Sequence, residues 1–329
     1  MKLSCVAFIG SVLLLLAMPG RAQDKDSVVL KTATGDIYGT LTVPESKQPL
    51  PVALFIAGSG PTDRNGNNPM MKNNSLKFLG EALNAQGIAT LRYDKRGIAA
   101  SKNAMKNETD IRFNMMVDDA ADLVKALKAD KRFSKVIVVG HSEGSTIGLK
   151  AVSMAGADAM VSIAGPGKKA DLVLREQLNA SLDPSKGVSP EAAEQMRQSR
   201  EIVNLYLDTL AKGDTLHDPV PSMSALFRPS VQPYLISWFK YDPQQLISAL
   251  KVPVLIIQGN TDLQVKEEDA TLLSKANPAA KLVIIDKMNH VLKHTELDQK
   301  ANHATYFDAN LPVAPELVTA IVSFIKGLK

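Results

Sequence analysis

Cysteine is almost absent from this 329-residue chain, whose single cysteine is Cys5. We expect residues 1–22 to be removed during export, so the mature chain would contain no cysteine. A chain without cysteine forms no disulfide, has no thiolate nucleophile and offers no cysteine-ligated metal site. Cysteine hydrolases and zinc-thiolate proteins are therefore excluded.

The apolar run at the N-terminus is shorter than the roughly 20 residues that a membrane-spanning helix needs. The uncharged run Val6–Met18 follows Lys2, and the small residues Gly20 and Ala22 come after it. This is the pattern of a secretory signal peptide, with cleavage near Ala22 or Gln23. We expect an exported bacterial protein, periplasmic or secreted, without a stable membrane anchor.

An excess of positive charge is also lacking. The formal net charge is +4 and falls to +2 when Lys2 and Arg21 leave with the signal peptide. No cluster of lysine and arginine forms a basic face, so we expect no nucleic-acid partner. With 45% hydrophobic residues the chain can bury a large core, as one large domain with an insertion or as two smaller domains.

Apolar strands alternate with helical patterns through most of the chain. Gly35-Asp36 marks the turn of a hairpin between two β-rich runs. The later pattern predicts strands at 52–56, 88–93, 136–139, 160–163, 252–258 and 281–285, and helices at 75–86, 115–129, 142–154, 267–276 and 315–326. Continuous apolar strands between helices indicate an α/β fold with a mostly parallel sheet and helices on both faces.

The alternation stops at residues 165–167, which read Gly-Pro-Gly, and resumes near Leu250. The intervening segment is helical in character, more charged than the rest and interrupted by prolines. A helical insertion inside an α/β fold is most simply a cap over the site. We therefore divide the chain into a signal peptide (1–22), a first core part (23–165), a cap (166–248) and a second core part (249–329).

Ser142 stands between Gly140 and Gly144, where the strand at 136–139 turns into a helix. The pattern G-x-S-x-G is weak evidence alone, but here it follows a buried strand and opens a helix in the middle of an α/β series. That context is typical of a nucleophile elbow, which exposes a serine hydroxyl above the sheet. The helix N-terminus favours the negative charge that develops there.

A nucleophilic serine needs a base and an acid that orients the base. Asp262 lies just beyond the strand at 252–258, and His290 lies just beyond the next strand. The chain order Ser142, Asp262, His290 is that of an α/β-hydrolase triad. The sequence therefore predicts these three residues as catalytic.

Other acids and histidines fit these roles less well. Asp269 should lie in a helix and Asp286 directly at a strand end, whereas Asp262 stands in a loop. His141 flanks the elbow and should point into supporting structure. The remaining histidines lie in the insertion or after His290: His217, His294 and His303.

The glycine-rich loop after the strand at 52–56 reads AGSGPTDRNGNNP. Acyl transfer needs N–H donors for the oxyanion, and a loop of this kind lets backbone amides approach a substrate. We predict the N–H of Glu143, the residue after the nucleophile, and that of Ser59, with Gly60 in reserve.

Cofactor and metal motifs fail on single residues. A dinucleotide fingerprint would need glycine where Asp63 stands, and a calcium loop from Asp63 would need glycine and glutamate where Asn68 and Asn74 stand. The pair His290-x3-His294 lacks the glutamate that a zinc protease places beside its first histidine. We expect no cofactor and no metal.

Five stretches together carry a family resemblance: GSGPTDRNGN, RYDKRG, GHSEG, YDPQQLISALKVPVLIIQGNTDLQV and MNHVLK. From about residue 27 to 329 the chain resembles exported bacterial α/β-hydrolases of the carboxylesterase group. That group is related to serine aminopeptidases and to the acyl-CoA thioesterase/bile-acid acyltransferase family. The resemblance implies an α/β-hydrolase fold with a helical cap and a hydrolytic serine.

One loop departs from the pattern of those relatives. They continue the arginine loop as R-G-x-G-x-S, whereas here Ala99 replaces the second glycine. That loop could follow a different path, or the cap could sit differently. We assign Asp94 and Arg96 to bracing of the loop near the elbow rather than to catalysis.

The predicted activity is hydrolysis of small-molecule carboxylic esters of short to medium acyl chain through an acyl-serine intermediate. A peptidase or amidase of the serine aminopeptidase type is the first alternative, for which Glu143 or the cap could bind a peptide amine. A thioesterase ranks below the peptidase as the second alternative, because an exported protein rarely meets acyl-CoA. A catalytically silent binding protein on the same fold is the alternative from another class. The natural ester and the oligomeric state are left open by the sequence.

Overall fold

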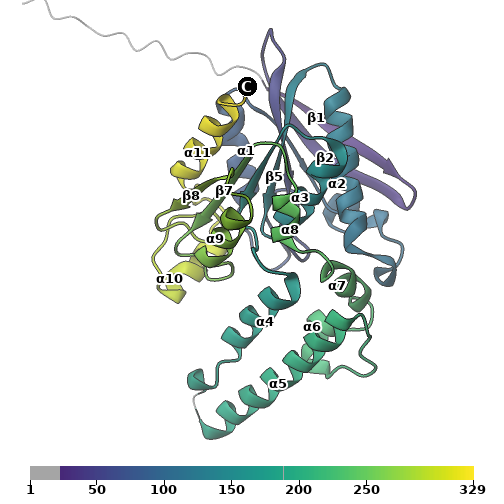
Figure 1. Ribbon diagram of the computed structural model, residues 1–329, viewed down its shortest axis with the longest axis vertical. Coiled ribbons are helices and arrows are strands. Elements are labelled where there is room, and N and C mark those ends of the chain that lie inside the picture. The colour runs from purple at the N-terminus through teal and green to yellow at the C-terminus, as the bar shows by residue number, and fades with distance from the viewer. Residues whose placement is uncertain (1–22, 188) are drawn as a thin grey trace, which may run out of the picture.

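The computed structural model describes residues 23–187 and 189–329. The predicted signal peptide, residues 1–22, lies outside the described residues. An eight-stranded sheet in the order β1-β2-β4-β3-β5-β6-β7-β8 forms the centre of the molecule (Figure 1). The predicted α/β fold is confirmed.

The first two strands form the predicted hairpin, with Thr32 paired to Gly35 across the turn. β2 joins β4 in antiparallel fashion, and every later pair in the sheet is parallel. The strands are β1 (Gln23–Thr32), β2 (Gly35–Pro44), β3 (Leu50–Ile56), β4 (Ala89–Tyr93), β5 (Phe133–His141), β6 (Ala159–Ile163), β7 (Val254–Gly259) and β8 (Lys281–Ile285).

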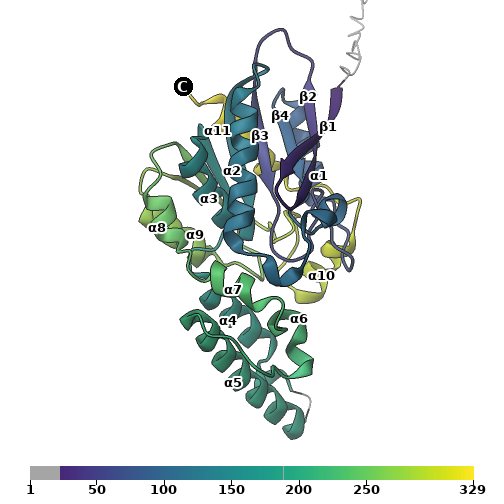
Figure 2. The same ribbon diagram turned by 90° about the vertical axis from the view of Figure 1, so that its right-hand side faces the viewer.

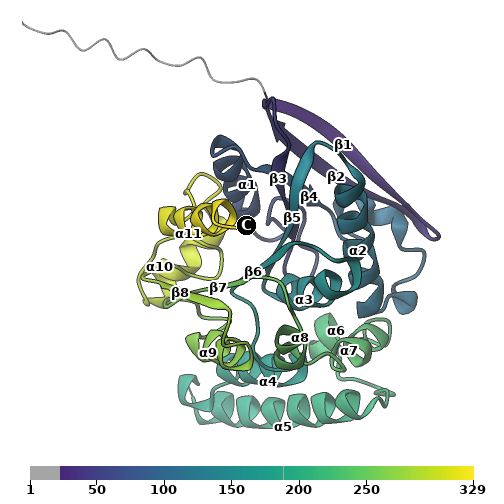
Figure 3. The same cartoon turned by 45° about the horizontal axis from the view of Figure 1, so that its top comes forward.

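Helices cover both faces of the sheet (Figure 3). One core contains residues from α2 (Phe113–Ala129), α3 (Glu143–Ala155) and α9 (Glu267–Ala276). The other contains residues from α1 (Ser75–Ala85) and α11 (Pro315–Lys326). Side chains of β3 alternate between the two cores, as expected for a strand buried on both sides.

The segment between β6 and β7 is helical. It contains α4 (Ala170–Ser181), η3 (Pro184–Lys186), α5 (Pro190–Lys212), η4 (Pro221–Met223), α6 (Ser224–Phe227), α7 (Gln232–Trp238) and α8 (Pro243–Ser248). Helices α4–α7 form a lobe at one end of the sheet (Figure 2). α8 instead packs against α3 and α9 of the core, although the sequence division placed it in the cap.

Element boundaries differ from the predicted ones where distant residues intervene. α2 begins at Phe113 rather than Met115, because the Phe113 N–H donates to Ser237 Oγ at 2.8 Å and its ring stacks on Trp238. α3 begins at Glu143 because Ser142 has a non-helical backbone. Short helices η1 (Ala99–Ala104), η2 (Glu108–Asp110), α10 (Gln299–Ala304) and η5 (Thr305–Phe307) lie in loops. No helix within the described ranges is long and apolar enough to cross a membrane.

Candidate active site

Ser142 occupies a strained turn between β5 and α3. Its φ of 56° and ψ of −124° lie in a region that non-glycine residues rarely adopt, as at a nucleophile elbow. A Cβ at Gly140 would lie 2.3 Å from the Gly144 carbonyl oxygen, and one at Gly144 would lie 2.2 Å from that of Ile56. Both glycines are therefore required by close backbone packing, which allows the turn to form.

Asp262 and His290 are brought together by the loops after β7 and β8. Nδ1 of His290 lies 2.8 Å from Oδ2 of Asp262, with side chains 7% and 1% exposed. Because the Nδ1–H of His290 donates a hydrogen bond to this carboxylate, Nε2 is the ring nitrogen that is left to accept a proton. The structure thus brings the two predicted residues into direct contact at a buried site.

Backbone N–H groups stabilise the Asp262 carboxylate. Oδ1 accepts from the N–H of Gln264 at 2.7 Å and of Val265 at 3.0 Å, and Oδ2 accepts from Gln258 Nε2 at 3.1 Å. Burial alone would raise the pKa of Asp262, but His290 and these hydrogen bonds outweigh it and hold the pKa below its usual value. The carboxylate remains charged beside the imidazole.

Direct hydrogen bonds join the two loops. The Thr261 N–H donates to the Met288 carbonyl at 3.2 Å, and the Lys287 N–H donates to Asn260 Oδ1 at 2.7 Å. One loop carries Asp262 and the other carries His290, so these bonds fix the position of His290 relative to Asp262.

His141 connects the elbow to His290. Its Nε2 donates to the His290 carbonyl oxygen at 2.8 Å, and the two rings are 4.9 Å apart. Burial, together with the neighbouring His290, lowers the pKa of His141 to about 3, so the ring is neutral. His141 points into supporting structure, as predicted, and ties the backbone of His290 to the residue before Ser142.

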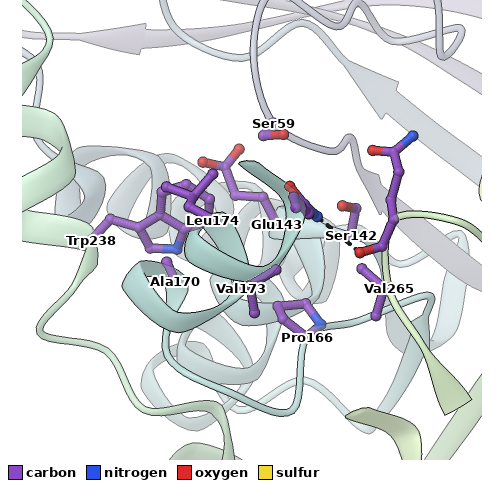
Figure 4. Close-up of a pocket in the computed structure, with 11 residues that line it drawn as sticks. Ser59, Ser142, Glu143, Pro166, Ala170, Val173, Leu174, Trp238 and Val265 are labelled. Atoms are coloured by element: carbon purple, nitrogen blue, oxygen red, sulfur yellow. Dashed lines mark hydrogen bonds between the residues drawn. The ribbon is translucent and has the colours of Figure 1, made fainter. Parts of the chain in front are cut away.

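The glycine-rich loop after β3 passes directly beside the serine. A Cβ at Gly58 would lie 3.1 Å from Cβ of Ser142. Ser59, Ser142 and Glu143 line one pocket of about 40 Å³ (Figure 4). The first N–H groups of a helix have no partner within it, so the Glu143 N–H is available to an oxyanion. The reserve residue, Gly60, borders an adjoining cavity instead.

That adjoining cavity extends between the core and the cap and has a volume of about 450 Å³. It shares Ser59, Glu143, Leu174 and Trp238 with the small pocket. Apolar side chains from both parts of the molecule form most of its wall, among them Ile98, Met105, Ile111, Met116, Leu226, Val231 and Leu235.

A buried charged cluster beside the pocket was not foreseen from the sequence. Nζ of Lys95 lies 2.7 Å from Oε2 of Glu143, and the Tyr234 hydroxyl donates to the other carboxylate oxygen. Lys95 belongs to the quoted RYDKRG motif, but no pattern linked it to Glu143 or to a tyrosine of the insertion. The sequence predicted Glu143 as a backbone donor to the oxyanion and, for a peptidase, as a group that binds the amine.

Asp94 and Arg96 brace loops, as proposed. Asp94 accepts from the Arg64 backbone N–H and side chain at 2.8 Å each, and from the Ala100 N–H at 3.1 Å. Arg96 Nε donates to Asp119 on α2 at 3.1 Å. Ala99 adopts φ 44°, so this alanine takes a left-handed conformation that favours glycine.

The rejected acids lie elsewhere. Asp269 lies in α9 and accepts from the Gly167 N–H at 2.8 Å, and the exposed Asp286 accepts from Asn260 at 2.8 Å. His294 contacts Glu316 at 2.9 Å. Within residues 23–187 and 189–329, no group of histidine, cysteine and acidic residues is arranged to hold a metal.

Several known proteins with similar sequences or folds are described as esterases or hydrolases. Residues 73–210 match the family model described as serine aminopeptidase, S33. Esterase EstD from Thermotoga maritima is 25% identical over 287 residues, which cover 83% of this chain and 61% of that protein. The chain therefore spans less than two thirds of the length of this relative.

Solved structures share the fold at low identity. Est1E from Butyrivibrio proteoclasticus, described with bound ferulic acid, has a TM-score of 0.58 and 17% identity over 91% of this chain and 99% of its own. The α/β-hydrolase GrgF from Penicillium sp. sh18 has a TM-score of 0.58 and 15% identity over 93% and 99%.

Proposed function

We propose that the chain is a serine hydrolase of the α/β-hydrolase superfamily, and that it cleaves carboxylic esters of short to medium acyl chain. The buried Asp262–His290 pair, hydrogen-bonded at 2.8 Å, is the observation that carries the proposal. A histidine fixed in this way serves as the base for a serine held in a nucleophile elbow.

In the proposed reaction, Nε2 of His290 takes the proton of the Ser142 hydroxyl as its oxygen attacks the ester carbonyl. The backbone N–H groups of Glu143 and Ser59 stabilise the oxyanion of the tetrahedral intermediate. His290 then protonates the departing alcohol and activates a water, which releases the acid from the acyl-serine. Asp262 holds the imidazole orientation throughout.

The cavities support an ester with one small and one larger apolar part. The pocket beside Ser142 has a volume of about 40 Å³, and the adjoining cavity of about 450 Å³ has mostly apolar walls. Apolar walls favour an uncharged hydrocarbon group. The curated relative named as an esterase also supports this assignment.

A peptidase is the second candidate, because the matching family model is that of serine aminopeptidases. An aminopeptidase must bind a positively charged amine, for which the sequence offered Glu143 or the cap. Lys95 and Tyr234 already bond both oxygens of that carboxylate, which weighs against this role.

Hydrolysis of graded substrates tests the proposal. The mature chain and Ser142→Ala should be compared on p-nitrophenyl esters of two to twelve carbons, on an aminoacyl-p-nitroanilide and on an acyl thioester. We expect ester turnover that falls with long chains and is lost in Ser142→Ala. Faster anilide or thioester cleavage would reassign the substrate class, and absence of both turnover and fluorophosphonate labelling would favour a binding protein.

We also propose that the protein is exported to the periplasm or the medium, on the pattern of residues 1–22. Expression of the full chain in a bacterial host, followed by cell fractionation and mass spectrometry of the N-terminus, tests this. A cytoplasmic protein that keeps Met1 would contradict it.

A further inference from the structure

Lys95 is a buried cation that takes no part in the reaction described above. Its side chain is 4% exposed. Nζ donates to the carbonyl oxygen of Gly58 at 2.6 Å and to Oε2 of Glu143 at 2.7 Å. A buried ammonium requires such partners, but the choice of the Gly58 carbonyl is specific, because Gly58 lies against Ser142.

The carbonyl of Gly58 and the N–H of Ser59 belong to one planar peptide unit. The described residues contain no cis peptide bond, so these two groups point in opposite directions. Fixing the carbonyl therefore fixes the direction of the N–H. A cation on the carbonyl oxygen also polarises the amide, which makes its N–H a stronger donor.

We propose that Lys95 is a positioning residue for the oxyanion site, which holds the Gly58–Ser59 peptide so that the Ser59 N–H is directed at the developing oxyanion. This inference rests on the proposed acyl-serine mechanism. Because Glu143 supplies the second N–H through its backbone and holds Lys95 through its carboxylate, one ion pair ties both donors together.

The cap contributes to the same arrangement through Tyr234 on α7. Burial, together with the Glu143 carboxylate, raises the pKa of Tyr234 well above its usual value. The hydroxyl therefore stays protonated and donates to Glu143. A continuous set of contacts runs from the cap through Glu143 and Lys95 to the Gly58 carbonyl.

A simpler role for Lys95 is neutralisation of the buried Glu143 charge. The two roles differ in what the double variant Lys95→Met/Glu143→Gln should do. If neutralisation were the only role, removing both charges would restore the rate. If Lys95 orients the Ser59 peptide, the double variant stays as slow as Lys95→Met, because nothing holds the Gly58 carbonyl.

The experiment compares the mature wild type, Ser142→Ala, Lys95→Met, the double variant and Lys102→Met, an exposed lysine on η1 that serves as a matched control. Each is assayed on p-nitrophenyl butyrate and on its thionoester, in which sulfur replaces the carbonyl oxygen. Sulfur accepts hydrogen bonds weakly, so thionoester hydrolysis depends little on the oxyanion donors.

We expect Lys95→Met to lower kcat on the oxoester by roughly 10- to 100-fold, less than or comparable to the loss of a whole oxyanion donor. KM should change little, and the ratio of oxoester to thionoester rates should fall. The double variant should behave like Lys95→Met, and Lys102→Met like the wild type. Thermal unfolding checks that each variant is folded.

Equal losses on the two substrates, or recovery in the double variant, would overturn the positioning role. If Lys95→Met does not fold, Tyr234→Phe takes its place, because it removes one donor to Glu143. The oxoester-to-thionoester ratio of Tyr234→Phe must then fall below that of the wild type. An unchanged ratio overturns the positioning role of Lys95. A wild type that neither hydrolyses esters nor reacts with a fluorophosphonate defeats the proposed function itself. If the wild type is active but Lys95→Met keeps the wild-type ratio of oxoester to thionoester rates, only this inference fails.

Discussion

Replacing Gly259 with alanine should separate the two loops that carry Asp262 and His290. Gly259 is the last residue of β7, and a Cβ there would lie 1.9 Å from the Met288 carbonyl oxygen. Real Cβ atoms essentially never approach another heavy atom closer than 3.0 Å, so the β8 loop must retreat by more than 1 Å. The Met288 carbonyl also accepts the Thr261 N–H, so the hydrogen bond between the loops would be distorted.

The expected loss of activity follows from the position of Met288, which lies two residues before His290. A displacement of about 1 Å in a catalytic group can cost on the order of 100-fold in rate. The overpacking caused by the added methyl group should also lower the unfolding free energy by about 1–3 kcal/mol. We therefore expect Gly259→Ala to be folded but to hydrolyse p-nitrophenyl butyrate roughly 100-fold more slowly.

The assay measures kcat/KM together with urea-induced unfolding of wild type, Gly259→Ala and Gly327→Ala. Gly327 is a suitable control, because a Cβ there would lie no closer than 3.2 Å to any neighbour and the residue has φ −85°. Wild-type activity and stability in Gly259→Ala would refute the reasoning that close contact between the loops sets the geometry of Asp262 and His290.

Three further predictions concern other parts of the molecule. Asp262→Asn should lower kcat by about 10⁴-fold in the ester assay, because the amide can donate to Nδ1 of His290 and favours the wrong tautomer of the imidazole. The control Asp286→Asn should keep near-wild-type activity. Equal activities of the two variants would contradict the triad. Ala99→Gly should raise the unfolding free energy by up to about 1 kcal/mol in urea titrations, because it relieves a left-handed alanine at φ 44°; a lower stability would contradict the strain. Burial lowers the pKa of Lys293 to about 8, so between pH 8 and about 10.4 the unfolded chain binds more protons than the folded one and stability rises with pH. Relative to Lys293→Met, the wild type should therefore gain up to about 3 kcal/mol between pH 7.5 and 10.5 in urea titrations, and a constant difference would show that burial does not shift this group.

Much of the fold could be predicted from the sequence because its signals are local. The strand predicted at 136–139 and the helix that follows it are encoded by apolar periodicity, and the turn at Ser142 by the flanking Gly140 and Gly144. The structure confirms the α/β fold, while the catalytic roles of Ser142, Asp262 and His290 stay predictions. Their supporting geometry, including the hydrogen bond between Asp262 and His290, was expected from their positions after successive strands.

Residues without a local pattern could not be assigned in this way. Lys95 and Tyr234 are 139 positions apart in the sequence, and nothing near either residue indicates that both contact Glu143. The start of α2 at Phe113 depends on Ser237 and Trp238 of the insertion. The contacts of Tyr234, Ser237 and Trp238 exist only after the cap has folded onto the core.

The sequence by itself therefore determined the elements, their order in the chain and the residue types available for acyl transfer. Short-range periodicity and the backbone freedom of glycine act within a few residues, so they can be recognised in a linear chain. Only the tertiary structure decided the partners of the buried charges and the cavity beside Ser142. Those features depend on which distant side chains meet in space, and burial makes each unpaired charge costly enough to require a specific partner.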